Sequence, residues 1–518
     1  MRKRNLFVLV SVLLMTIMLG SCNPSADYQS VIPAEPVMVM KVNVDNLLAK
    51  SEILQDNQIT GIVKNGINEK MPENSRELMR SILVDPANSG LDLKQPAFFV
   101  MENIEQARGL ALFAVKDVEQ VKTFLNVFIE GDEDALIEDK GDYTLLKNNN
   151  ENIIAFDNTK LVVAFAQGVC DAAEYITAED NGKKSDALKR FIASNDDAAY
   201  YIAYKDIMRL AEGVNPEAFA LVDVKQFEDA KMIVNINFEA GKAVMKGKFE
   251  DAEELMEQSK EYMAEPETSL QKFLPGANYG FIQYGVKNIG KYIEETLPEA
   301  QREVFQECLT KANKELHKMG VQTDLTTSML NSLDGGIIFG VSEADKTSPL
   351  PIPQMVLMAE SKDDALFQLL IGGLQRNKLV TQLEENVYSI MGMYTLAYAD
   401  NKIVLMPSNL YTQCYANGSF NALADNLSAN KMSKLIGDKN GMALDAQAIA
   451  EVLKEMGLAR TRSDKAMLDL LSKFAYTTMT INKDCEFEWI VAFEDANTNS
   501  LKQIKDMAIS SAIGNAIR

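Results

Sequence analysis

KMIVNINFEAGKAVMKGKF, residues 231–249, contains the pattern that decides the fold. Two runs rich in apolar and β-branched residues, 231–238 and 243–249, flank the segment EAGK, whose glycine suits a tight turn. This pattern predicts a hairpin of two antiparallel strands. Asp251 follows the second strand and predicts the start of a helix, because aspartate caps helix N-termini well.

The chain before this hairpin predicts a succession of strands and helices. We expect strands near 37–44, 97–101, 110–115, 143–146, 153–156, 161–165 and 199–204, and helices near 75–83, 118–128, 170–176 and 185–192. Hairpin connections outnumber crossovers, which favours antiparallel pairing. The predicted fold class is α+β, with a largely antiparallel sheet and helices packed on one face.

The second half of the chain repeats patterns of the first at a nearly constant spacing. KLVV at residue 160 recurs as KIVL at residue 402, and FEDA at residue 249 recurs at residue 493. We therefore expect two tandem copies of the mixed unit, residues 31–265 and 269–518. Copies that keep their core must keep the spacing inside each element, because side chains alternate across a strand.

Residues 1–21 have the composition of an export signal. A basic head, MRKRN, precedes the apolar run LFVLVSVLLMTIMLG at residues 6–20. A membrane-spanning helix needs roughly 20 residues, so the run fits the apolar core of a signal peptide instead. It ends in Leu19-Gly20-Ser21-Cys22, which resembles the lipobox of bacterial lipoproteins. The resemblance implies cleavage between Ser21 and Cys22 and a lipid on the Cys22 thiol, with residues 22–30 as a tether.

The residues after Cys22 suggest where the protein is anchored. Asn23 stands where an aspartate would resemble an inner-membrane retention signal, and this favours the outer membrane. Surface-exported lipoproteins of the Bacteroidota often carry an acidic run here, whereas residues 23–27 contain one acid. We expect a lipid-anchored envelope protein on the periplasmic face of the outer membrane.

The charge of the chain argues against two classes of partner. The net charge is −22, with 74 acidic and 52 basic residues. Such a surface repels phosphate backbones, so we predict no nucleic-acid binding. It also disfavours peripheral binding to anionic lipid heads, which leaves the acyl chain as the expected membrane anchor.

The sequence lacks the residue patterns of common catalytic sites. His317 is the one histidine, which excludes multi-histidine metal sites. No GxGxxG, Walker or GxSxG motif occurs. The acidic run Glu130–Asp134 is interpreted as a solvated loop, because Leu136 replaces an oxygen ligand of a calcium loop. We predict no cofactor, no metal and no catalytic residue, although the sequence cannot select among carboxylate pairs.

The cysteines, the tryptophan and the methionines are expected to be structural. Cys308 is placed on the apolar stripe of a helix, and it is expected to be unpaired, as are Cys170, Cys414 and Cys485. Trp489 alternates with apolar residues in the last hairpin and is expected to face the core. The many methionines, among them Met391-Gly392-Met393, are interpreted as core filler rather than as copper ligands.

Several segments together resemble a family of Bacteroidota lipoproteins that is defined as a domain of unknown function. The lipobox carries the resemblance, with Ile32-Pro33-Ala34 before an apolar strand and GLDLKQP at residues 90–96 before a second strand. The resemblance covers most of the chain after Cys22. It implies neither an activity nor catalytic residues.

We expect a membrane-anchored envelope lipoprotein that is a non-catalytic binding or scaffold protein. Its expected partners are the membrane, through the lipid, and an envelope protein or other ligand. Two alternatives stay open, an Asp/Glu-dependent hydrolase of envelope or dietary glycans and a carrier of an apolar ligand. Two carboxylates in a polar groove would favour the hydrolase, whereas an apolar cavity would favour the carrier.

Overall fold

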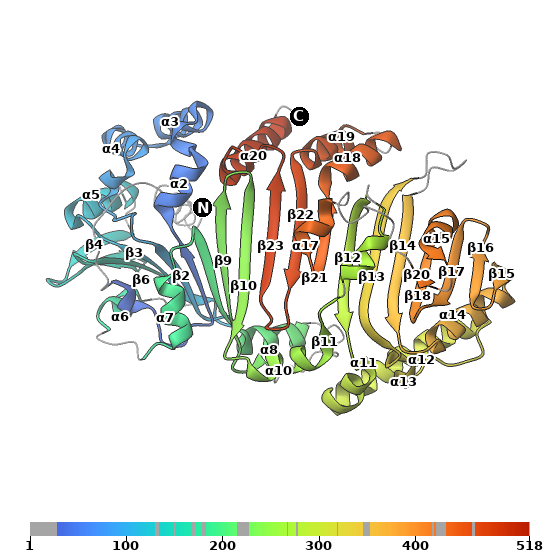
Figure 1. The fold of residues 1–518 in the computed structure, drawn as a ribbon. Helices are drawn as coiled ribbons and strands as arrows, with labels where there is room; N and C mark the ends of the chain where they lie inside the picture. The colour runs from blue at the N-terminus through green and yellow to red at the C-terminus, as the bar shows by residue number, and fades with distance from the viewer. Residues whose placement is uncertain are drawn as a thin grey trace. The chain divides into compact units, whose positions relative to one another are not determined.

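The computed structural model is shown in Figure 1. It describes residues 28–129, 134–149, 151–167, 171–178, 183–214, 227–266, 268–275, 278–318, 320–344, 353–416, 419–420, 431–457 and 461–516. Within these ranges, 21 strands belong by hydrogen bonding to one sheet, and β19 (Tyr415–Ala416) and β20 (Ser419–Phe420) form a separate pair. The registered strand pairs are antiparallel, as the hairpin pattern predicts.

The chain divides into two compact units that are each discontinuous in sequence. Unit 1 contains the chain up to Ile207, Ala230–Met245 and the C-terminal segment from Ala496. Unit 2 contains Met208–Asp229 and Lys246–Asp495. Helix α8 (Tyr204–Val214) and strand β10 (Lys242–Glu250) contribute to both units.

Unit 1 has nine strands in the hydrogen-bonded order β9-β8-β1-β2-β3-β7-β6-β5-β4 within its described part. The strands are β1 (Met38–Val42), β2 (Ala97–Asn103), β3 (Arg108–Ala114), β4 (Ala135–Asp139), β5 (Thr144–Asn148), β6 (Glu151–Phe156), β7 (Lys160–Phe165), β8 (Ala198–Ala203) and β9 (Lys231–Glu239). The helical segments are η1 (Tyr28–Val31), α2 (Val44–Ser51), η2 (Ile53–Gln55), α3 (Asn57–Lys70), α4 (Glu73–Val84), η3 (Pro86–Ser89), α5 (Val118–Ile129), α6 (Ala172–Ile176), α7 (Asp186–Ala193) and α20 (Ser500–Ala516).

Both faces of the unit 1 sheet are covered. On one face, Ala111 and Phe113 of β3 join a core with residues of α2, α3, α4 and α5. On the other face, Leu110 and Leu112 of the same strand join a core with residues of η1, α6 and α7. Neighbouring residues in a strand point to opposite faces of the sheet. A strand that is covered on both faces, such as β3, therefore buries consecutive residues.

The C-terminal helix α20 packs against the start of the chain in unit 1. The Asp56 carboxylate caps α3 by accepting the backbone N–H groups of Gln58 and Ile59, and it pairs with the Lys505 ammonium at 3.0 Å. Lys502 of α20 forms a second ion pair with Glu52. These contacts join α20 to the segment between α2 and α3 within unit 1.

Unit 2 has the strand order β23-β22-β21-β12-β13-β14-β18-β17-β16-β15 in its described part, and β11 pairs with β12. The strands are β11 (Met263–Ala264), β12 (Asn278–Val286), β13 (Leu333–Ala344), β14 (Pro353–Ser361), β15 (Val380–Glu384), β16 (Val387–Ile390), β17 (Tyr394–Ala399), β18 (Lys402–Pro407), β21 (Asn440–Asp445), β22 (Phe474–Ile481) and β23 (Phe487–Phe493). The helical segments are α10 (Glu253–Tyr262), η5 (Thr268–Phe273), α11 (Ile289–Lys291), η6 (Tyr292–Thr296), α12 (Glu299–Lys318), α13 (Thr327–Leu330), α14 (Ala365–Arg376), α15 (Ser408–Cys414), α17 (Lys431–Ile436), α18 (Ala446–Glu455) and α19 (Arg462–Leu471).

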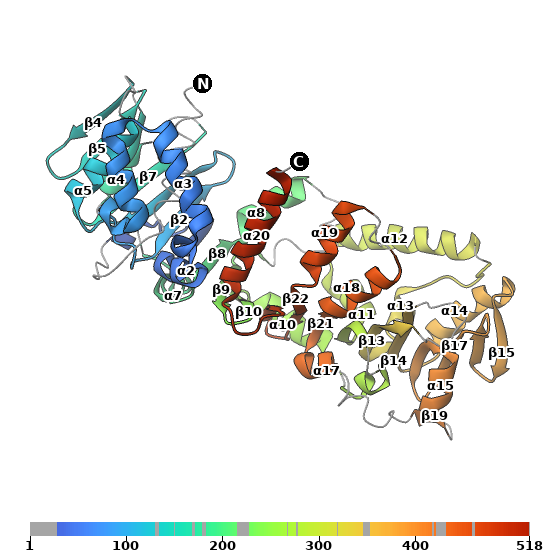
Figure 2. The same ribbon diagram turned by 90° about the horizontal axis from the view of Figure 1, so that it is seen from above.

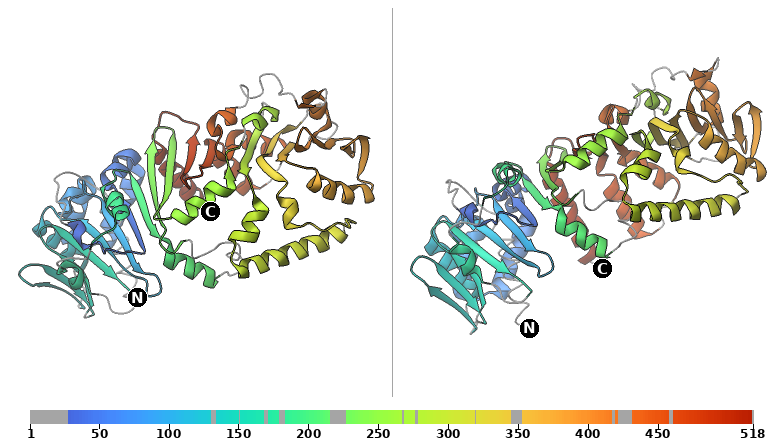
Figure 3. Two further views of the ribbon diagram at one scale, coloured as in Figure 1. Left: turned by 60° about the horizontal axis from the view of Figure 1, so that its bottom comes forward. Right: turned by 90° about the horizontal axis from the view of Figure 1, so that it is seen from below.

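Helices pack on both faces of the unit 2 sheet. Residues of η5, α15 and α17 pack on one face against β12, β13, β14 and β21. On the opposite face, Phe367 and Ile371 of α14 cover Tyr388, Leu396 and Ile403 of β16, β17 and β18. Figure 2 shows α15 and α17 on one side of this sheet and α12 and α14 on the other, and Figure 3 shows the long yellow-green helix α12 from two further directions.

The predicted architecture of two tandem copies, each with helices on one face, is wrong. In the described residues, all strands except β19 and β20 belong to one sheet of 21, and the compact units interleave in sequence because α20 returns to unit 1. Helices cover both faces of the sheet, as the two cores on β3 demonstrate. The local elements agree with the sequence far better, since the predicted hairpin corresponds to β9 and β10.

Candidate functional site: an uncharged sheet face and a lysine-lined pocket

One face of the unit 2 sheet presents apolar side chains to solvent. Residues directly opposite each other on paired strands point to the same face. The registers of six strands, from β23 to β14, therefore align Trp489, Met479, Met442, Ile282, Phe339 and Leu357 in one row. A second row contains Val491, Thr477, Leu444, Gly280, Val341 and Met355.

Alternate residues of these strands differ sharply in burial. On β12, Phe281 is 2% exposed, whereas its neighbour Ile282 is 44% exposed. On β13, Ile338 is fully buried, whereas Phe339 is substantially exposed. The buried set belongs to the core under α15 and α17. We call the two rows above the open face; Trp489, Met479, Ile282, Phe339 and Met355 are its exposed members, Gly280 is buried, and the other six residues are partly buried.

The open face continues into a covered core. Leu357 of the first row pairs with Leu405, which pairs in turn with Leu396, and Leu396 pairs with Tyr388. This end of the row lies in the core under α14. The same row of side chains is therefore a hydrophobic core over β16, β17 and β18 and an exposed surface from β14 to β23.

No residue of either row is charged, although 24% of the chain is charged. The Trp489 indole is 42% exposed, and its Nε1–H donates to Thr477 Oγ1 at 2.9 Å. The prediction that Trp489 faces the core is wrong, because in β23 the buried positions are those of Ala492 and Phe493. The open face was not predicted from the sequence. The pattern that could have revealed it is a pair of consecutive apolar residues in one strand, such as Phe281-Ile282 in FIQY of β12, because consecutive residues point to opposite faces of the sheet.

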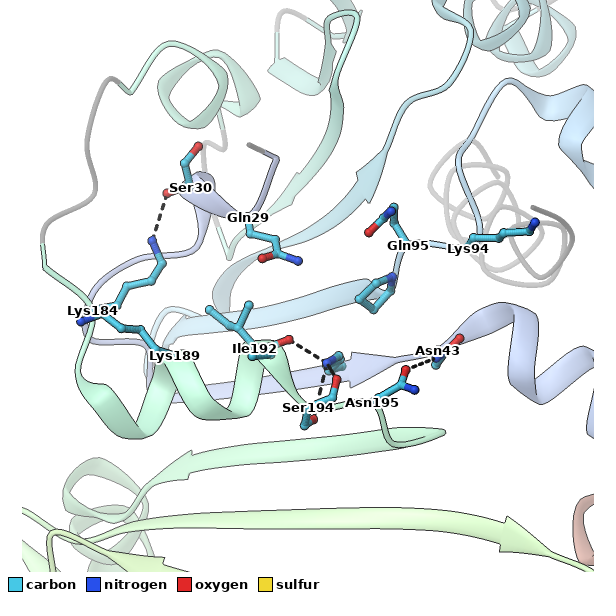
Figure 4. Close-up of a pocket in the computed structure, with 13 residues that line it drawn as sticks. Gln29, Ser30, Asn43, Lys94, Gln95, Lys184, Lys189, Ile192, Ser194 and Asn195 are labelled. Carbon is cyan, nitrogen blue, oxygen red and sulfur yellow. Dashed lines mark hydrogen bonds between the residues drawn. The ribbon is translucent and has the colours of Figure 1, made fainter. Parts of the chain in front are cut away.

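Unit 1 contains an open pocket of about 600 Å³ (Figure 4). It lies between η1, the segment before β2 and the C-terminal end of α7. Its lining is Gln29, Ser30, Lys41, Asn43, Lys94, Gln95, Pro96, Lys184, Lys189, Ile192, Ala193, Ser194 and Asn195. Four of these residues are lysines and none is acidic.

Lys41 of β1 is the buried cation of this pocket, with 3% of its surface exposed. Its Nζ donates to the carbonyl oxygens of Ile192, at 2.7 Å, and of Ser194. These carbonyls lie at the C-terminal end of α7, where backbone acceptors lack intrahelical partners. Burial lowers the pKa of Lys41 to about 8, and the Asp196 carboxylate raises it in part.

Several residues singled out from the sequence lie outside the described residues. These are Ser21, Cys22, Cys170 and the acidic run Glu130–Glu133. His317 lies in the last turn of α12, as expected for a helix-end histidine, with Nε2 2.8 Å from Asp324 Oδ1.

The described cysteines and methionines agree only in part with the predictions. Cys308, Cys414 and Cys485 are free thiols, as predicted. Cys308 is exposed on α12, however, so the prediction that it lies on the buried apolar stripe of a helix is wrong. Met391 and Met393 are exposed at the turn after β16 rather than in a core.

The remaining searches of the described residues concern metals and membrane spans. No group of three or more His, Cys, Asp or Glu side chains there has the geometry to hold a metal ion. Every helix in the described ranges falls short of the length and apolar character that crossing a membrane requires.

The family model described as "Domain of unknown function (DUF4836)" matches residues 28–501. The chain belongs to this family. The predicted resemblance to a domain of unknown function is thus confirmed, and DUF4836 carries no assigned activity. A comparison with curated proteins found no match.

Among solved structures, crystal form IV of TP0453 aligns at 9% identity and a TM-score of 0.27, over 46% of this chain and 88% of that chain. Crystal form I of TP0453 aligns at 10% identity and a TM-score of 0.26, over 44% and 80% of the two chains. Alignments with TM-scores this low carry no argument about fold or function.

Proposed function

We propose that this DUF4836 protein is a lipid-anchored protein of the bacterial cell envelope that acts by binding and not by catalysis. The open face is its binding surface, and the occupant is an apolar surface of a partner protein. The anchor is the Cys22 lipid, and the location is the periplasmic face of the outer membrane, in a bacterium of the Bacteroidota. The observation that carries the binding role is the uncharged row from Trp489 to Leu357.

The covered end of that row supports this role. Where α14 lies on it, the row is an ordinary core in which Phe367 is fully buried. The remaining side chains have the same chemistry, and exposed apolar patches of this kind mark interaction sites. Covering Ile282, at 44% exposure, would complete the core that α14 begins.

The composition of the open face favours a protein as the occupant. The centres of protein interfaces are depleted in charged residues and enriched in aromatic residues and methionine. Trp489, Phe339, Met479 and Met355 match that description. Methionine also adapts its shape to a partner because its side chain is flexible and polarisable.

The two alternatives receive less support from the geometry. None of the described residues that line the unit 1 pocket carries a carboxylate, whereas a glycan hydrolase of the expected type needs a pair of them. A carrier normally encloses most of its ligand, whereas Trp489 and Ile282 of the open face are more than 40% exposed.

A photocrosslinking experiment in intact cells tests the proposal. A photoreactive phenylalanine analogue replaces Phe339 in the full-length protein, at the centre of the open face. We expect one crosslinked partner protein, which after purification binds the unmodified chain directly. Ile282→Lys should abolish both results, because it places a charge in the first row. Val84→Lys, at an exposed apolar position of α4, is the matched control and should change neither.

Other crosslinked products would overturn the proposed occupant. A covalent dimer of this chain would make the open face a self-association surface. A lipid adduct on the monomer would make it a carrier surface. A protein crosslink that persists in Ile282→Lys would show that the partner contacts another part of the molecule.

A further inference from the structure

The unit 1 pocket has a charge opposite to that of the whole chain. The chain has a net charge of −22, yet the described residues that line the pocket include four lysines and no acid. In Figure 4, Lys184 and Lys189 lie together at one edge, Lys94 lies at the opposite edge, and the side chains of Gln29 and Gln95 lie between them. Lysine side chains favour anions, because each ammonium acts as a point charge.

The nearby carboxylates offset this charge only in part. Asp186 pairs with Lys189 at 3.1 Å, and this ion pair offsets part of the charge of Lys189. The Asp92 carboxylate accepts the backbone N–H of Lys94 at 3.3 Å. Asp196 accepts a hydrogen bond from Asn237 at 2.7 Å. None of these acids lines the pocket.

The pocket floor is built to hold its shape. Two carbonyls of the α7 end bind the Lys41 ammonium, Ile192 at 2.7 Å and Ser194 beside it. The Lys41 side chain is 3% exposed, so its position is fixed by packing as well as by these bonds. A pocket of about 600 Å³ is within the size range of small-molecule and headgroup sites.

The pocket also lies close to the proposed anchor. Tyr28 is fully buried and its hydroxyl donates to Pro96 O at 2.8 Å, which fixes the chain beside Gln29 and Ser30. Six residue steps separate Tyr28 from Cys22, so the extended chain reaches about 20 Å at most. If Cys22 carries the proposed lipid, the pocket is held within roughly that distance of the membrane surface.

We propose that this pocket binds a phosphate group, presented by an anionic lipid headgroup or by a small soluble phosphate ester. The amide groups of Gln29, Gln95 and Asn195 donate hydrogen bonds to the phosphate or to the hydroxyl groups next to it. The nearness of the pocket to the membrane rests on the proposed lipidation, whereas the binding chemistry does not. With a lipid headgroup as the source, the site would orient unit 1 on the membrane in addition to the proposed lipid on Cys22.

The test measures binding in the absence of the lipid anchor. The mature chain carrying Cys22→Ser is titrated with phosphatidylglycerol vesicles, with phosphatidylcholine vesicles and with glycerol 3-phosphate. We expect it to bind phosphatidylglycerol vesicles and to be displaced by glycerol 3-phosphate. The double variant Lys94→Gln with Lys184→Gln should bind roughly 30-fold more weakly. Lys140→Gln with Lys246→Gln removes the same charge from exposed sites outside the pocket and is the matched control.

The outcomes separate the two phosphate sources. Saturable, pocket-dependent binding of glycerol 3-phosphate without vesicle binding supports the soluble source. Absence of binding to all probes, or an equal loss in the control variant, overturns the proposal. Because the anchor is absent, none of these outcomes depends on whether Cys22 is lipidated or whether the open face binds a protein.

Discussion

Lys41 illustrates, at the scale of one residue, how the fold changes the chemistry of a side chain. It stands in β1, whose sequence is MVMKV, and burial lowers its pKa from 10.5 to about 8, with Asp196 raising it in part. The folded chain therefore releases this proton at a lower pH than the unfolded chain does. The charged form destabilises the fold at neutral pH, and the penalty is relieved as the pH rises through 8 toward 10.5.

This titration predicts that stability rises with pH over a defined window. Between about pH 8 and about pH 9 the unfolded chain holds more protons than the folded chain, so the free energy of unfolding should rise by about 1 kcal/mol. Urea unfolding followed by circular dichroism at both pH values measures the change. Lys41→Met should lose the rise, whatever its stability at either pH.

The rise in the free energy of unfolding is expected to end near pH 9, because the titration of another buried group then has the opposite effect on stability. Burial raises the pKa of the Cys414 thiol from 9.0 to about 11, so above pH 9 the unfolded thiol ionises first, and the resulting loss of stability offsets the gain from Lys41. Lys189→Met removes an exposed lysine of the same pocket and should retain the rise. An undiminished rise in Lys41→Met would assign the effect to a different group.

Single residues differ in how far the sequence predicts their place. A helix-end position for His317 follows from the length of its helix, and the structure agrees. The pocket around Lys41 joins residues near positions 30, 41, 95 and 190, and no local pattern links them. The sequence shows only one lysine within an apolar strand. That pattern by itself indicates that the lysine is buried and does not predict a pocket.

At the scale of the element, the sequence predicts strands and helices well and their faces poorly. Alternation and turn residues place β9 and β10 within one or two residues of the predicted hairpin. The N-cap of α2 is Asn43, whose side chain accepts a hydrogen bond from the backbone N–H of Asn46. Which face of a strand is covered depends on helices that are distant in sequence. In β3 six consecutive residues are buried, so no alternation of apolar and polar residues indicates which face is covered.

Neighbouring residues of β12 should therefore respond differently to truncation. Phe281→Ala should lower the free energy of unfolding by about 3–5 kcal/mol, because it leaves a cavity in the core under α15 and α17. Ile282→Ala should cost under about 1 kcal/mol, because its side chain is already 44% exposed. Urea unfolding of both variants at one pH provides the comparison. A cost for Ile282→Ala equal to that for Phe281→Ala would mean that the open face is covered in solution.

At the scale of the whole molecule, recurring local patterns do not determine how the chain is partitioned. Strands, caps and hairpins of similar sequence recur in any large antiparallel sheet, because each reuses the same turn and capping chemistry. The compact units instead follow long-range contacts, such as the Asp56–Lys505 pair that holds α20 in unit 1. Such contacts join residues hundreds of positions apart and leave no periodic signal in the sequence.

The anchor gives the last prediction, because the folded body and the lipid are separable in the chain. In the proposed anchor the Cys22 thiol carries the lipid, so Cys22→Ser should remove metabolic palmitate label and leave the signal peptide uncleaved by the lipoprotein peptidase. The fold should persist, since the described body begins at the buried Tyr28. Circular dichroism of the purified variant should therefore match that of the unmodified protein.

Cys308→Ser is the matched control for the loss of label. Cys308 is an exposed free thiol on α12 of the folded body, so it is the described cysteine most accessible to a reagent or an acyl donor. This variant should retain the palmitate label and the membrane fractionation of the unmodified protein. Label that persists in Cys22→Ser, or that disappears in Cys308→Ser, would place the lipid on the folded body. Membrane attachment would then no longer hold the unit 1 pocket within about 20 Å of the bilayer.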